Sequence, residues 1–156
     1  MKSMEYKMNA IRKIEIFQRD RNLHVKEYNW NNEAKNILEE LFEAKGYDIP
    51  KEYRSQVFDP ILAHSEDLIR DIVPNSKAVR SSAISADESV DAFGDVIVFA
   101  VGAIMKLGYD PEKVLQEVAK EINSRVGSII DGKFEKDLSD EARANWYKAD
   151  FTNCKI

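Results

Sequence analysis

Residues 86–107 read ADESVDAFGDVIVFAVGAIMKL, and the character of this stretch is the main basis for predicting the fold. We expect it to form one helix of about 21 residues, roughly 30 Å long at 1.5 Å per residue. Its central run, VIVFAVGAIM at 96–105, is apolar on nearly every side, whereas the surface helix of a monomer is apolar along one stripe. The long helix is therefore predicted to lie in the middle of a helical bundle or at an interface between subunits.

Small residues on the same helix favour the close approach of a neighbouring helix. They are Gly94, Ala100, Gly102 and Ala103. Close packing at these positions offsets the ~1 kcal/mol that a glycine inside a helix costs relative to alanine. We therefore expect the chain to assemble with copies of itself, as a homodimer or a homotetramer.

The rest of the chain is predicted to be helical as well, with no confident strand. Apolar stripes and end signals indicate helices over about 4–20, from an N-cap at Asn31 or Asn32 to Gly46, over a shorter stretch that begins near Ile61, and from Pro111 to about Ser124. Two prolines make 47–60 a loop with at most a short turn, and the tail from 126 onward carries a short helix near 140–146. These elements predict an all-α fold, a bundle of four to five helices in a single domain over 1–156.

The composition is that of a soluble globular protein, and it limits the partners. The chain has 23 basic and 28 acidic residues, a formal net charge of −5. Binding to a DNA or RNA polymer is disfavoured, because such binding depends on clustered Lys and Arg. No window approaches the roughly 20 apolar residues of a membrane span, and the one cysteine, Cys154, cannot form an intrachain disulfide. We therefore expect a cytoplasmic protein that binds neither a nucleic-acid polymer nor a membrane.

Two acidic groups lie beside apolar positions instead of on a fully polar face. They are Glu39-Glu40-x-x-Glu43 and Glu88-x-x-Asp91-x-x-x-Asp95. Each group contains carboxylates three or four residues apart, which lie one helical turn apart and point in similar directions. Asp95 leads directly into the apolar run, where desolvating an unpaired carboxylate would be costly. These positions suggest that something positive binds to both groups.

A hard divalent cation meets that need, since Mg²⁺ takes a few carboxylates, keeps several waters and completes its coordination with substrate phosphates. Taken alone, an acidic pattern on one helix is more often a solvated surface. Two such groups on helices expected to pack together favour a metal site. The Glu-x-x-His pairs of di-iron bundles are absent from the sequence, which disfavours a di-metal oxidase.

Candidate groups for binding phosphates lie at the end of the helix expected over 111–124. They are Lys120, Asn123 and Arg125. Cations at a helix C-terminus also complement the helix dipole, and this alternative is favoured for Lys120 taken alone. The sequence contains no GxxxxGK[ST] or GxGxxG motif. Phosphates would therefore be handled by metal ions and side chains.

The pattern resembles the all-α nucleotide pyrophosphohydrolases, the superfamily of MazG, phosphoribosyl-ATP pyrophosphatase and the dimeric dUTPases. The resemblance covers roughly 30–125 as the core and leaves about 126–156 as a tail. Glu39, Glu40 and Glu43 match the first motif of the family, EExxE, and Asp95 matches the aspartate of its second motif, ExxD. The segment DPEKVLQEV at 110–118 is similar to the family as well, and DAFGDVIVFA at 91–100 looks most like MazG-related proteins of bacteriophages.

The resemblance implies that Glu40, Glu43 and Asp95 bind Mg²⁺, for which Mn²⁺ can substitute. One position departs from the family, because Ala92 stands where the second motif has its glutamate. Asp91 or Glu88 then supplies the missing ligand, and the sequence leaves both alternatives open.

The implied activity is hydrolysis of a nucleoside triphosphate, or a related nucleotide, between the α and β phosphates to give a monophosphate and pyrophosphate. One acid, Glu39 or Glu43, orients the attacking water or takes its proton. Asn123 and Arg125 bind the other phosphates. The alternative from another class is a non-catalytic helical protein, either a nucleotide-binding regulator with a decayed metal site or an oligomeric interaction module, and Ala92 is the feature that favours it.

Overall fold

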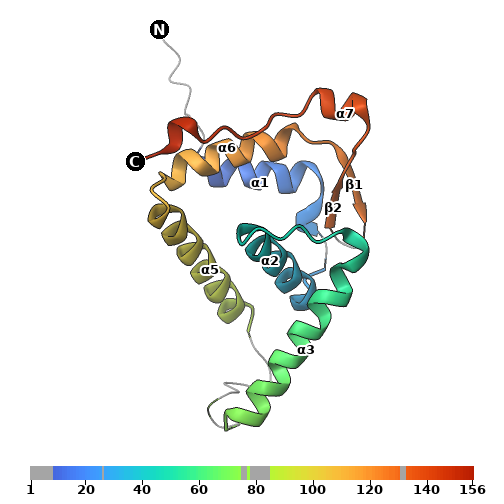
Figure 1. Cartoon of the computed structure of the whole chain (residues 1–156), viewed down its shortest axis with the longest axis vertical. Coiled ribbons are helices and arrows are strands. Elements are labelled where there is room, and N and C mark those ends of the chain that lie inside the picture. The colour runs from blue at the N-terminus through green and yellow to red at the C-terminus, as the bar shows by residue number, and fades with distance from the viewer. Residues whose placement is uncertain (1–8, 26, 75–76, 78–84, 131–132) are drawn as a thin grey trace. The chain divides into compact units, whose positions relative to one another are not determined.

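The computed structural model describes residues 9–25, 27–74, 77, 85–130 and 133–156. Helices make up most of it, which confirms the all-α expectation at the level of class (Figure 1). The helices are α1 (Ala10–Asp20), α2 (Trp30–Ala44), α3 (Arg54–Ile72), α5 (Ala86–Lys106), α6 (Pro111–Ser124) and α7 (Asp140–Ala144). Short 3-10 helices span Leu23–Val25, Lys51–Tyr53 and Thr152–Cys154. No helix within the described ranges combines the length and apolarity that crossing a membrane requires.

The chain divides into two compact units, and each is described by itself. Unit 1 comprises Met1–Lys26 and Val90–Ile156, and unit 2 comprises Glu27–Ser89. Unit 1 contains α1, α6, α7 and nearly all of α5, and unit 2 contains α2 and α3. The single domain and the MazG-like bundle remain predictions.

In unit 1, α1 and α6 lie side by side (Figure 1). Ala10 and Ala119 are fully buried, and side chains this small let two helices approach closely. The Ala10 N–H donates a 3.1 Å hydrogen bond to the carboxylate of Glu112 at the start of α6. Phe17 is also buried and meets the edge of the Phe134 ring with 5.6 Å between centroids. This pair of helices forms the core of the unit.

The predicted start of one helix at Pro111 and the predicted end of another at Gly46 are confirmed. Asp110 is the N-cap, accepting a hydrogen bond from the Lys113 N–H, and Pro111 occupies the first helical position. Gly108 has a φ of +86°, so the chain turns there in a conformation that glycine adopts without steric cost. Gly46, with a φ of +102°, plays the same part after α2.

Unit 2 departs from the sequence prediction at two helix starts. The N-cap of α2 is Asn29, whose side chain accepts from the Asn32 N–H, and not Asn31 or Asn32. The third helix begins at Arg54, so most of the predicted loop is helical and Pro60 lies inside α3. Proline removes one helical hydrogen bond. The fully buried Phe58 beside it, whose ring centroid lies 5.9 Å from that of Phe42, supplies packing that outweighs this loss.

The sequence analysis predicted no confident strand, but the structure contains a two-stranded β-hairpin. β1 (Gly127–Ile130) pairs antiparallel with β2 (Lys133–Lys136), and Gly127 stands opposite Lys136. A Cβ at Gly127 would lie 2.0 Å from the backbone carbonyl oxygen of Glu135, so only glycine fits at this crossing. The Asp-Gly pair at 131–132, typical of hairpin turns, was the available sequence signal.

The C-terminal tail runs back along α6 to its first turn (Figure 1). The Asp110 N–H donates to the Cys154 carbonyl at 2.7 Å, and the Ile156 N–H donates to the Gly108 carbonyl at 3.0 Å. Residues 145–156, which follow α7 and are called the C-terminal tail from here on, therefore form part of unit 1.

The apolar side chains of α5 are exposed. Ile97, Val98 and Phe99 retain 54%, 65% and 78% of their accessible surface. Successive residues of a helix project about 100° apart, so these three side chains point in three different directions. Within unit 1, α1, α6 and the tail therefore leave these faces of α5 uncovered, and both the helical bundle and the subunit interface stay predictions.

Candidate functional site

The first acidic group lies on the second half of α2 in unit 2. Glu40 and Glu43 are exposed, and their positions on the helix are about 60° apart at 100° per residue. The structure thus gives this pair the common direction that the sequence predicts.

Glu39 differs from its two neighbours in the motif. Its side chain is only 12% exposed, and its carboxylate lies 2.6 Å from Nε of Arg54, the first residue of α3. The guanidinium also donates to the side-chain oxygen of Asn36. The sequence prediction did not include Arg54, because nothing local links it to a motif 11 to 15 residues earlier.

The second acidic group lies on the first half of α5. Glu88 and Ser85 form a capping box, with the Ser85 N–H donating to the Glu88 carboxylate at 3.0 Å and the Glu88 N–H donating to the Ser85 hydroxyl at 3.2 Å. This structural role favours Asp91 over Glu88 as the replacement for the acid missing at Ala92. Asp91 and Asp95 are both exposed and lie one turn apart.

The exposure of Asp95 corrects one step of the sequence argument. The cost of desolvating a carboxylate beside the apolar run was expected to require a positive partner. Within unit 1 Asp95 is exposed, so the packing of that unit imposes no such cost.

The carboxylate pairs on α2 and α5 are the kind of oxygen ligand that a hard cation prefers, but each pair alone supplies only two ligands. Each helix supplies two carboxylates one turn apart, and Mg²⁺ is usually bound by one or two carboxylates together with waters and phosphates. Across the described ranges, no set of three or more Asp, Glu, His or Cys side chains gathers closely enough to hold a metal ion. The α2 pair belongs to unit 2 and the α5 pair to unit 1, so each is considered as half of the predicted site.

The predicted phosphate-binding residues have partners within unit 1. Lys120 lies 2.6 Å from the Glu117 carboxylate and 5.6 Å from the centre of the Tyr147 ring. Arg125 pairs with Glu121 and lies over the Trp146 ring. Asn123 donates to the carbonyl oxygens of Lys13 at 3.3 Å and Ala119 at 2.8 Å. Both cations therefore connect α6 and its C-terminal end with the C-terminal tail.

Glu117 holds the tail, a role that the sequence did not reveal. Its carboxylate accepts hydrogen bonds from Lys120, from the Tyr147 hydroxyl and, at 3.2 Å, from the Asp150 N–H. The hydrogen bond from Lys120 and those from Tyr147 and Asp150 lower the pKa of Glu117 to about 2, from 4.5. All three donors favour the ionised carboxylate, so the tail is held by a charged acceptor at neutral pH.

We expect the stability of unit 1 to fall as the pH falls through the range from about 4.5 to about 2. A carboxylate whose pKa is lowered by folding stabilises the fold above its unfolded pKa, and this contribution disappears as the folded group is protonated. In Glu117→Gln, the urea concentration at the midpoint of unfolding should depend less on pH between about 4.5 and about 2 than in the wild type. Glu141→Gln, which makes the same charge change at an exposed position of α7, should leave this dependence unchanged. Equal curves for both variants would contradict the assignment.

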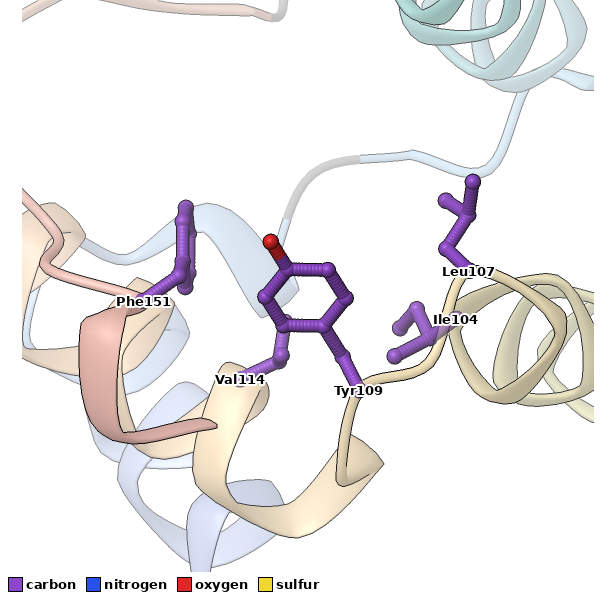
Figure 2. Close-up of a pocket in the computed structure, with 5 residues that line it drawn as sticks. All are labelled: Ile104, Leu107, Tyr109, Val114 and Phe151. Carbon is purple, nitrogen blue, oxygen red and sulfur yellow. The ribbon is translucent and has the colours of Figure 1, made fainter. Parts of the chain in front are cut away.

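An apolar cavity of about 190 Å³ lies where α5, α6 and the tail meet (Figure 2). Ile104, Leu107, Tyr109, Val114 and Phe151 line it. None of the predicted metal-binding or phosphate-binding residues is among them. The lining contains no charged side chain, so it does not contribute to the predicted metal and phosphate sites.

Comparisons with known proteins found no match to this chain among family models, curated proteins or solved structures.

Proposed function

We propose that the chain is a Mg²⁺-dependent nucleotide pyrophosphohydrolase that cleaves between the α and β phosphates. The observation that carries this proposal is the presence of two pairs of exposed carboxylates, each one turn apart, on α2 and α5. The resemblance of both motifs to the all-α pyrophosphohydrolases supplies the reaction.

Glu40 and Glu43 on α2 and, separately, Asp91 and Asp95 on α5 would be the carboxylates that hold Mg²⁺ ions. When bound, Mg²⁺ neutralises phosphate charge and lowers the pKa of a coordinated water. Glu43, or Glu39, accepts the proton of the attacking water. Water is consumed as the phosphoanhydride bond breaks, and a nucleoside monophosphate and pyrophosphate leave.

Assembly with a second copy forms part of the proposal. The exposed apolar side chains of α5 lie beside Gly94 and Gly102. Apart from each glycine's chain neighbours and the surrounding backbone of α5, no described atom lies within 4 Å of where a Cβ would stand on either glycine. This open space along an apolar helix suits the backbone of another helix.

A panel assay tests the activity. Pyrophosphate release is measured from ribo- and deoxynucleoside triphosphates and phosphoribosyl-ATP, with Mg²⁺, with Mn²⁺ and with EDTA. We expect metal-dependent release with the monophosphate as the other product. Silence across the panel, from protein whose circular dichroism shows the helices intact, would overturn the proposal.

The alternative is a non-catalytic nucleotide-binding or interaction protein. The ion pairs of Lys120 and Arg125 with acids on their own helix favour it, since they leave the predicted phosphate-binding cations engaged. This alternative predicts nucleotide binding that EDTA does not change, or no nucleotide binding at all.

A further inference from the structure

One face of α2 lies against α3, and Glu39 belongs to that face. Lys35 lies 2.9 Å from the Asp59 carboxylate, Glu39 contacts Arg54, and the Phe42 ring contacts Phe58. These three residues of α2 follow the spacing i, i+4, i+7, which places them within an arc of about 60°. Glu39 therefore stands in the stripe that contacts α3.

Arg54 binds two positions of α2 at once. Its Nε donates to Glu39, and its Nη2 donates to Asn36, one turn earlier. The side chains of Arg54 and Glu39 are 19% and 12% exposed, so water screens this pair less than a surface pair. A planar guanidinium that donates in two fixed directions restrains its partners more than a flexible lysine does. The contact thus limits rotation of α2 about its axis.

We propose, on the basis of the function proposed above, that Arg54 and Glu39 are positioning residues of the metal site. Their contact fixes the rotation of α2 so that Glu40 and Glu43 face solvent together. Glu39 itself is then neither a metal ligand nor the base that accepts the proton from water, which assigns that role to Glu43. Residues that do not touch the metal but hold its ligands in place orient the groups that bind it. Losing such a residue typically costs about 10- to 100-fold in metal affinity or activity.

The first test removes the contact without changing the net charge. The double variant Arg54→Ala with Glu39→Ala deletes one cation and one anion. Binding of Mn²⁺ to the full chain is then measured from the electron paramagnetic resonance signal of the Mn²⁺ that remains free. We expect an affinity about tenfold lower than that of the wild type. The matched control, Lys35→Ala with Asp59→Ala, deletes the other ion pair between α2 and α3, and its affinity should stay within about twofold because a lysine restrains rotation weakly.

The unfolding midpoint in urea separates positioning from stability. A pair that merely joins α2 to α3 would lower the midpoint and leave the Mn²⁺ affinity of the folded protein unchanged. That result for the Arg54 and Glu39 double variant would overturn the inference.

A second comparison separates Glu39 from the ligands. Glu39→Gln keeps an oxygen that accepts from Arg54, and we expect its Mn²⁺ affinity to stay within about threefold of the wild type, whereas Glu43→Gln should lose at least about tenfold. Equal losses in the two variants would make Glu39 a ligand and overturn the inference.

Failure of the proposed function gives a different result. A wild type that binds Mn²⁺ but releases no pyrophosphate would overturn the hydrolase alone, and the variants would still test the positioning role by affinity. A wild type that neither binds Mn²⁺ nor releases pyrophosphate would overturn both.

Discussion

Glutamine in place of Glu43 is expected to lower Mg²⁺-dependent pyrophosphate release by at least about a hundredfold. The substitution removes a proposed metal ligand. Losing even a residue that only orients a metal ligand lowers metal affinity or activity by about 10- to 100-fold. Because Glu43 is exposed, the fold should be nearly unaffected, with a change in the free energy of unfolding within about 0.5 kcal/mol. Turnover at saturating nucleotide and a urea unfolding curve measure the two quantities.

Asp95→Asn should give the same loss from the second helix, and Asp87→Asn is the matched control. Asp87 lies in the first turn of α5, is exposed and belongs to neither carboxylate pair, so the control makes the same charge change on the same helix. We expect it to retain most of the activity. An active Glu43→Gln variant would show that Glu43 is not a metal ligand. Equal losses from Asp87→Asn and Asp95→Asn would show that the assay responds to the charge of α5 and not to a metal site.

Local signals in the sequence predicted α5 and α6 well. The boundaries of α6 follow from Asp110, Pro111 and the glycine before them, each of which acts within a few residues of its own position. The extent of α5 follows from an uninterrupted run of helix-compatible residues. Such signals need no knowledge of the rest of the fold.

Elements that depend on distant contacts were predicted less well. Pro60 indicates a helix end locally, yet the buried contact of Phe58 with Phe42 keeps the helix continuous through it. The strands of the hairpin are four residues each, and only the pairing of Gly127 with Lys136 explains why a glycine stands there. Pairing of this kind is a property of the folded chain.

In the candidate site, too, local spacing predicted some features, whereas others depend on contacts between residues far apart in the sequence. The spacing of Glu40 and Glu43 was enough to predict their shared direction. It could not show that Glu39 faces α3, because this depends on where Arg54 lies in space. The pairs of Glu117 with Lys120 and of Glu121 with Arg125 are three and four residues apart, so their spacing could have been read from the sequence. The contacts of the same two carboxylates with the tail could not, because the tail returns to them from residues 147–150.

If the chain assembles as proposed, glutamate in place of Phe99 is expected to give monomers. Phe99 is 78% exposed on a helix whose neighbouring positions are also apolar and exposed, and large contiguous patches of this kind mark contact surfaces. Burying one phenylalanine side chain contributes about 1.5–3 kcal/mol. A symmetric dimer buries two copies, so removing them costs about 3–6 kcal/mol, which weakens association a hundredfold or more. Sedimentation velocity at micromolar concentrations measures the change.

Leu138→Glu is the matched control for this experiment. Leu138 is 60% exposed and lies between β2 and α7, away from the apolar positions of α5, and single exposed apolar residues are common on monomers. The same charge placed there should leave the assembly unchanged, because no partner helix is expected to cover it. A monomeric wild type would overturn the proposed assembly. An assembly that survives Phe99→Glu would show that its interface does not depend on this face of α5.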